Sequence, residues 1–180
     1  LVVPTMLSWP ASAVITDLKG ELWALTAGWR KKHAKNRVLR FEPASSSGGI
    51  CWNPLDESRL GTEFEVGDVQ NLAQLIVDPD GKGLDSHWQK TAFSLLVGVI
   101  LHALYKAKAD GTYATLPSVD AMLADPNRDI GELWMEMATY GHVDGQNHHA
   151  IGSAARDMMD RPEEEAGSVL STAKSYLSLY

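Results

Sequence analysis

The sequence predicts a mainly α protein, with about six to seven helices in an all-α domain at residues 51–180 and a βαβ unit at residues 1–50. Helical periodicity with capping signals recurs from Asn53 onward, whereas β-branched segments typical of strands come before it. The charge also changes sign there. Residues 1–49 carry seven Lys/Arg and three Asp/Glu, a net +4, while residues 50–180 carry nine and twenty, a net −11. We therefore expect two regions with different partners.

Three segments make up the first region. Residues 12–18 are short, apolar and β-branched between Pro10 and Gly20, which predicts a buried strand. Residues 21–35 have an apolar helical stripe and end in a basic turn, which favours a helix. Residues 37–43 predict a second strand, so the three segments form a βαβ unit with a right-handed crossover. A loop is expected at residues 44–50 from their Ala, Ser and Gly content.

The first helix of the larger region is predicted at residues 66–77. Thr62 and Glu65 fit a capping box, in which each side chain accepts a hydrogen bond from the other residue's amide. Asp78 and Pro79 end the helical pattern. This segment is thus expected to be an amphipathic helix with a defined start and stop.

The longest helix is predicted from an N-cap at Asp85 or Ser86 to a stop at Gly111. It is apolar nearly all round its middle, which is typical of the central helix of a bundle. Pro162 can open the last helix, with three glutamates in its first turn. The other helices are expected at residues 116–125, 129–141 and 147–161.

The apolar stretch at residues 95–105 is broken by His102 and is shorter than the ~20 residues that span a bilayer. We therefore expect no membrane-spanning helix. The chain begins at Leu1 without Met, a basic n-region or a cleavage site, so we expect it to be part of a longer protein.

Single-residue features point to packing rather than chemistry. The lone cysteine, Cys51, excludes an internal disulfide, and we expect it to be a small core residue in a reducing compartment. Trp88, Trp134 and Tyr140 lie in helical stripes, which predicts core packing for each. No GxSxG motif or triad supports a hydrolase.

Metal-site patterns are also incomplete. In "DPDG" the glycine, Gly81, falls at position 4, whereas a calcium loop needs it at position 6, so a turn is expected. His142, His148 and His149 have neither a cysteine pair nor HExxH spacing. We expect these histidines in a polar loop or helix cap, and no metal.

Asp17, Lys19 and Glu21 fall together in the turn between the first strand and the first helix. The carboxyl edge of a parallel sheet is where ligands bind, but a ribose site needs an upstream GxGxxG motif that this chain does not show. A ligand-facing cluster and a helix N-terminal charge cluster both remain open.

The order of several motifs resembles a known family. "VITDLKGE", "RFEP", "WNPLDE", "VDPDGKG", "SHWQKTA" and "GSVLSTAKSYL" follow one another as in the TraG family of type IV secretion coupling proteins, the conjugative DNA-transfer motors. The resemblance covers the whole chain. It implies a membrane-anchored hexamer at the cytoplasmic face of the bacterial inner membrane, with an all-α domain inserted in a RecA-like motor domain. Residues 1–10 would continue the helix after the phosphate loop.

The nucleotide-binding motifs of the family are not in this chain. The Walker A loop would precede residue 1 and the Walker B residues would follow residue 180, so no catalytic residue, cofactor or ATP turnover is expected here. ATP and Mg²⁺ are implied for the intact parent. By resemblance, the residues beside its nucleotide site are Asp17, Lys19, Gly20 and Glu21.

The family also implies partners for the helical domain. These are the relaxase and accessory proteins of the relaxosome, other type IV secretion components, and DNA indirectly or weakly. A net charge of −11 repels phosphate and favours a basic protein partner, although acidic faces also serve solubility. A DNA-contacting surface and a structural spacer for ring assembly are the alternatives. We expect partner contacts at Asp80, Lys82, Asp85, His87, Asp144, Gln146 and His148.

Overall fold

The structure is a computed structural model that describes residues 1–43, 45 and 49–178. The chain divides into two compact units, Leu1–Trp52 and Asn53–Tyr180. Most of the loop predicted at residues 44–50 lies outside the described residues. Each unit is described by itself.

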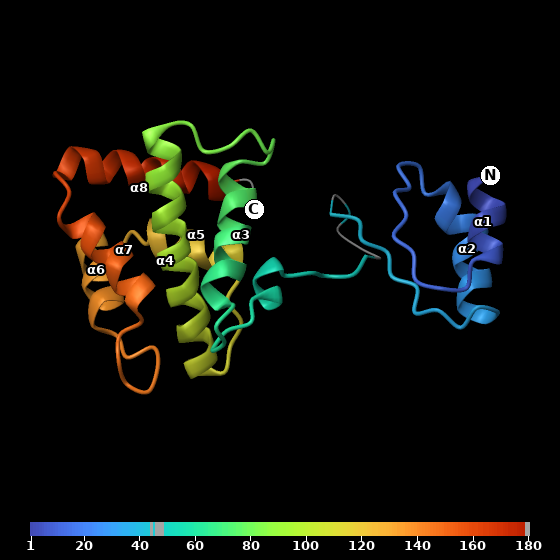
Figure 1. Cartoon of the computed structure of the whole chain (residues 1–180), viewed down its shortest axis with the longest axis horizontal. Helices are drawn as coiled ribbons and strands as arrows, with labels where there is room; N and C mark the ends of the chain where they lie inside the picture. The colour runs from blue at the N-terminus through green and yellow to red at the C-terminus, as the bar shows by residue number, and fades with distance from the viewer. Residues whose placement is uncertain (44, 46–48, 179–180) are drawn as a thin grey trace. The chain divides into compact units, whose positions relative to one another are not determined.

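The structure is mainly helical, as predicted (Figure 1). The first unit contains α1 (Val2–Ser8) and α2 (Glu21–Lys32). The second unit contains a 3₁₀ helix, η1 (Pro54–Glu57), and six α-helices: α3 (Glu65–Val77), α4 (His87–Asp110), α5 (Leu116–Ala124), α6 (Ile130–Thr139), α7 (His149–Met159) and α8 (Glu163–Leu177).

The predicted βαβ unit needs correction. Its helix is present as α2, but residues 12–17 and 37–42 form no strand in the part of the chain that the structure describes. A strand is stable only when neighbouring strands satisfy its amides and carbonyls. Two lone segments of this kind have no sheet to join, so they remain connections beside a pair of helices.

A buried arginine holds the first unit together. Arg30 is 5% exposed, and its Nη1 donates to the carbonyl oxygens of Met6 and Trp9, while Nη2 donates to that of Ala11, each at 2.8 Å. Met6 is the only buried apolar side chain among the described residues of this unit. Polar bonds therefore replace a hydrophobic core in positioning α1 against α2.

The second unit is built around α4, which packs against α3, α7 and α8. Figure 1 shows α3 and α7 on either side of α4, with α8 crossing near its N-terminal end. Ser86 and Gln89 form a capping box at its start, and Gly111 ends it with φ +66°. Both boundaries were predicted, with Ser86 rather than Asp85 as the N-cap. The central position of α4 follows from its apolar surface.

By length and composition, α4 is the one described helix that would fit across a membrane. Of its most apolar stretch, 67% is buried inside the second unit. The buried core helix of a bundle can have the same length and composition. The apolar stretch of α4 is longer than residues 95–105, the stretch identified from the sequence.

Close packing of α4 on α7 depends on a glycine. A Cβ atom added at Gly98 would lie 2.4 Å from Cβ of Ala154 and 3.4 Å from Cε of Met137. Carbon atoms pack at about 3.5–4.0 Å, so only glycine fits at this crossing. The small side chains thus allow the two helices to approach.

The predicted capping box at Thr62 and Glu65 is wrong. The helix α3 begins at Glu65 itself, and the Glu65 carboxylate accepts hydrogen bonds from Gly61 N at 2.6 Å and Tyr105 Oη at 2.7 Å. It also lies 3.0 Å from His148 Nε2. The Glu65 side chain does not form the predicted cap, because Tyr105 and His148, which are distant in sequence, bind its carboxylate.

Candidate functional site

The charged turn before α2 caps that helix. The Asp17 carboxylate accepts a hydrogen bond from the backbone amide of Trp23 at 2.8 Å, and Gly20 has φ +73°, which glycine adopts without strain. Lys19 and Glu21 are exposed. A helix N-terminal charge cluster therefore explains the position of Asp17 in this chain. A place beside a nucleotide stays a prediction.

The loop before α4 is folded around Asp78. Asp78 is 8% exposed, and its carboxylate accepts hydrogen bonds from the amides of Gly83 at 2.7 Å and Lys82 at 2.9 Å, and from Gln74 Nε2 at 3.2 Å. The bonds from Gly83 and Lys82 lower the pKa of Asp78, since they stabilise its ionised form. The segment is a tight turn, as predicted, with a fixed shape.

This fixed loop presents charged side chains. Asp80 and Lys82 are exposed and form an ion pair with Nζ and Oδ2 2.7 Å apart. The loop, Asp85, Gln89 and Tyr176 line a hollow of about 360 Å³. Three of the predicted partner-binding residues therefore lie together on one rigid surface at the start of α4.

The second predicted loop is a tight hairpin. Val143 and Gln146 exchange backbone hydrogen bonds of 3.1 and 2.8 Å, and the two residues between them, Asp144 and Gly145, have φ +49° and +78°. Asp and Gly tolerate these angles, which suit a two-residue hairpin turn. The side chains of Asp144 and Gln146 are exposed.

His148, at the end of that hairpin, is held inside the unit. Its side chain is 12% exposed, and its Nε2 bonds to Glu65. Its amide donates to Nδ1 of His142 at 3.3 Å, which leaves His142 Nε2 to donate to Nδ1 of His102 at 2.9 Å. The remaining proton of His102 then sits on Nε2, 3.6 Å from the Glu136 carboxylate. These three histidines form a chain between the hairpin and α4.

Burial keeps two of these histidines neutral. His102 is fully buried and His142 is 8% exposed, and burial lowers the pKa of each to about 4. Burial alone would raise the pKa of Glu136, but hydrogen bonds from Lys106 and Arg128 lower it, so this carboxylate stays ionised. We expected loop or cap histidines from the sequence, which missed this buried chain. Its one visible signal was His102 interrupting an apolar stretch.

The two loops lie at opposite ends of α4. The first precedes its N-cap, whereas His148 reaches α4 at the level of Tyr105 through their shared partner Glu65. His87 and Tyr105 are 18 positions apart, which is about 27 Å along a helix. Figure 1 shows the hairpin between α6 and α7 at the end of α4 away from the first loop. The predicted partner-binding residues thus form two separate surfaces.

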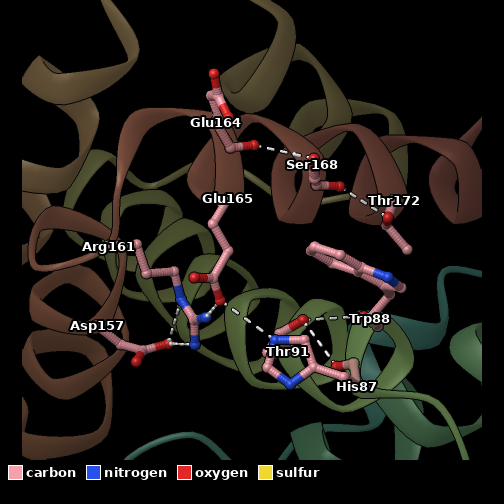
Figure 2. Close-up of polar contacts among 9 residues, drawn as sticks. All are labelled: His87, Trp88, Thr91, Asp157, Arg161, Glu164, Glu165, Ser168 and Thr172. Carbon is pink, nitrogen blue, oxygen red and sulfur yellow. Dashed lines mark hydrogen bonds and ion pairs between the residues drawn. The ribbon is translucent and has the colours of Figure 1, made fainter.

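A polar cluster connects the start of α4 to the α7–α8 turn (Figure 2). His87 Nε2 lies 3.2 Å from the Glu165 carboxylate. Arg161 binds the same carboxylate and also Asp157, through Nη2 at 2.7 Å and Nε at 3.2 Å. His87 was predicted as a partner-binding residue, whereas its connection to α8 was not predicted, because these residues are 78 positions apart.

Of the four packing predictions, two are wrong, one is confirmed and one is met in part. Trp134 is buried, as predicted, but Trp88 is 43% exposed because it lies in the first turn of α4, beyond the enclosed part of the core. Tyr140 is half-buried, with its ring centroid 4.9 Å from that of His142. Cys51 is exposed, because it lies in the connection before η1 and joins no core. Within the described residues, no group of three or more His, Cys, Asp or Glu is placed to hold a metal ion.

Comparison with known proteins identifies the family. A model of the family described as "Type IV secretory system Conjugative DNA transfer" matches residues 1–180. The chain is 92% identical over all its residues to conjugal transfer protein TraG of Escherichia coli and 85% identical to another protein of that name and organism, and it spans 28% of the length of each. Over 87 residues, 47% of the chain, it is 34% identical to protein VirD4 of Rhizobium radiobacter, of which the match covers 12%.

No solved structure matches the chain. The resemblance seen in the motifs is nevertheless confirmed, because the family model and the TraG proteins match from the first residue to the last. This chain belongs to the family of type IV secretory system proteins for conjugative DNA transfer.

Proposed function

We propose that the second unit is the partner-docking domain of a type IV secretion coupling protein, which receives the relaxase–DNA complex during bacterial conjugation. The longer protein would be a hexameric, ATP-driven DNA translocase at the cytoplasmic face of the inner membrane. Membership of the conjugative DNA transfer family supports this role. The chain spans about a quarter of its curated relatives, so the motor activity belongs to the proposal for the whole protein.

The charge of the helical unit carries the docking proposal. The second unit, Asn53–Tyr180, contains every acidic and basic residue of residues 50–180, so its net charge is −11. The first unit has a net charge of +4. A negative surface attracts basic proteins over a Debye length of about 8 Å at physiological salt and repels phosphate. The relaxase and accessory proteins of the relaxosome are therefore better partners for this unit than bare DNA.

The predicted contact residues differ in how well they can meet a partner. Asp80, Lys82 and Asp85 are exposed on the rigid loop before α4. Asp144 and Gln146 are exposed on the hairpin, but His148 is engaged with Glu65 inside the unit. A rigid loop exposes side chains without a large entropy cost on binding, which favours the loop before α4 as the main contact.

For the first unit we propose a place beside the nucleotide site of the longer protein. Asp17, Lys19, Gly20 and Glu21 would lie near bound ATP and Mg²⁺, whose phosphate-binding loop is supplied by other segments. We assign these residues no catalytic role and this chain no ATP hydrolysis by itself.

A pull-down of the whole chain against relaxosome components tests the docking proposal. At about 0.15 M salt, we expect the chain to retain the cognate relaxase with or without DNA, and not to retain single-stranded DNA alone, since a net negative unit repels phosphate. Retention of relaxase only when DNA is present would instead favour a DNA-contacting surface. If the chain retained neither, a structural spacer would replace the docking role.

A further inference from the structure

We infer that the hairpin segment between α6 and α7 is a proton-released strap, which detaches from α4 in mild acid while the rest of the second unit stays folded. The strap comprises residues 141–148, and the chain of His148, His142 and His102 fastens it to α4. This inference concerns a conformational switch within the unit and does not rest on the proposed docking function.

The strap has almost no apolar attachment. Within residues 141–148, the one buried side chain is that of His142. Val143, the only apolar side chain of the strap, is 42% exposed. Asn147 Nδ2 donates to the Met137 carbonyl at 2.7 Å, which ties the strap to the end of α6 and not to α4. Polar rings therefore hold the strap on α4 in place of a hydrophobic anchor.

The hydrogen bonds of the histidine chain leave no place for another proton. His142 Nδ1 accepts from the His148 amide at 3.3 Å, and His102 Nδ1 accepts from His142 Nε2 at 2.9 Å. In this arrangement Nε2 of each ring already carries its proton. A further proton on either Nδ1 would set two donors against each other. Each protonation thus breaks one of the two bonds that fasten the strap.

The surroundings of the bonded pair favour the neutral form. Burial lowers the pKa of His102 and of His142 to about 4, and Glu136 only partly offsets this effect. Detachment would bring His142 into water, where its pKa returns toward about 6.5. Proton uptake therefore favours the detached strap, which is closed above pH ~6.5 and opens as the pH falls. The charged and titratable groups that face the chain are Glu65 of α3, Tyr105 and Lys106 of α4, Arg128 before α6, Glu136 of α6 and Tyr140 at its C-cap.

The rest of the unit does not depend on the strap for its packing. The hydrophobic core joins α4 to α3, α7 and α8, and no residue of 141–148 belongs to it. A segment with few buried apolar contacts opens at a lower free energy than the whole unit. We therefore expect the strap to open first when the histidines take up protons.

Amide hydrogen exchange of the full chain, followed by NMR from about pH 7 to 4.5, tests the inference across the histidine range. Each exchange rate is compared with that of an unfolded peptide at the same pH, which gives the protection of the amide. We expect the protection of the His148 amide to fall about tenfold per pH unit below ~6.5, because opening takes up a proton at His142. The Leu101 amide, in the middle of α4, should keep a larger protection at every pH, since only global unfolding exposes it.

Two variants assign the effect to the chain. His142→Gln keeps a side-chain donor for His102 but has no titratable ring, so its His148 protection should fall less than about threefold per pH unit. His149→Gln is the matched control, because it also replaces one histidine by glutamine but leaves the three-ring chain intact, so the tenfold fall should persist. Protection of Leu101 at about pH 7 shows whether each variant is folded.

The two amides of the wild-type chain decide the outcome even if His142→Gln does not fold. Equal protection of His148 and Leu101 at every pH would overturn the inference, since the strap would then open only with the whole unit. A His148 protection that does not change with pH would also overturn it. So would a pH dependence that a folded His142→Gln variant retains in full.

Discussion

Gly98→Ala is expected to destabilise the helical unit by about 1–3 kcal/mol, although alanine is the better helix former. The added methyl group would stand 2.4 Å from Cβ of Ala154, and a Cβ atom has no rotamer with which to avoid the contact. The helices α4 and α7 must therefore move apart. Because α4 is central to the core, its other contacts would loosen as well.

A matched substitution separates packing from helix propensity. Gly167 also lies inside a helix, α8, but a Cβ atom there meets nothing within 4 Å. Gly167→Ala should therefore stabilise the unit by about 0.5–1 kcal/mol. Urea unfolding of both variants measures the two signs, and Gly98→Ala combined with Ala154→Gly should recover part of the loss. Stabilisation by both alanines would contradict the close approach of α4 and α7.

Mild acid is expected to destabilise the same unit through its buried histidines. Each of His102 and His142 has a pKa of about 4 in the fold, whereas an unfolded histidine has a pKa of about 6.5. Both are neutral in the fold, so their stabilisation is complete above pH ~6.5 and is lost as the pH falls toward about 4. Within this window the unfolded chain binds up to two more protons, which costs about 2.7 kcal/mol per pH unit at most.

Neighbouring charges influence these histidines in both directions. Glu136 raises the pKa of each, but burial outweighs it, and Lys106 and Arg128 also lower the pKa of His102. For His142, the charge of His148 is the next cause that lowers the pKa after burial. Carboxylates with lowered pKa, such as Glu136, lose their stabilisation only at more acidic pH.

Urea unfolding between about pH 7.5 and 4.5 measures this dependence, since that range covers the histidine window. His102→Gln should flatten the profile, because it removes one buried titrating group. His149→Gln is the matched control, since it also replaces one histidine by glutamine but at an exposed position outside the buried chain. A stability that does not change over this range would contradict the buried, neutral histidine pair.

Local signals were enough to predict the helix boundaries. Ser86 caps α4, Gly111 ends it, and the residues around Pro162 start α8, each by bonds to backbone groups within one helical turn. Pro162 itself proved to be the N-cap residue rather than the first helical residue. The apolar helical stripe likewise predicted the burial of Trp134. Features set by neighbouring residues can be predicted because short-range geometry decides them.

Features set by distant residues could not be predicted in this way. Glu65 has the spacing of a capping box, but Tyr105 and His148 bind its carboxylate. The bond between His102 and His142 joins residues 40 positions apart, so no local spacing indicates it. The contact between the start of α4 and the α7–α8 turn could not be predicted for the same reason, because His87 and Glu165 are 78 positions apart. The strand-like residues 12–17 failed as a prediction because a strand depends on partners outside its own sequence.

A salt titration of binding is the most direct test of the docking role. The full chain would be titrated with the cognate relaxase and, separately, with single-stranded DNA, from about 0.05 to 0.3 M salt, a range over which phosphate contacts weaken steeply. We expect the relaxase to bind at about 0.15 M salt and to weaken as salt rises, because opposite charges are screened, while DNA shows no binding. Binding of DNA with a steep salt dependence, together with no binding of relaxase, would contradict a helical unit that docks basic proteins.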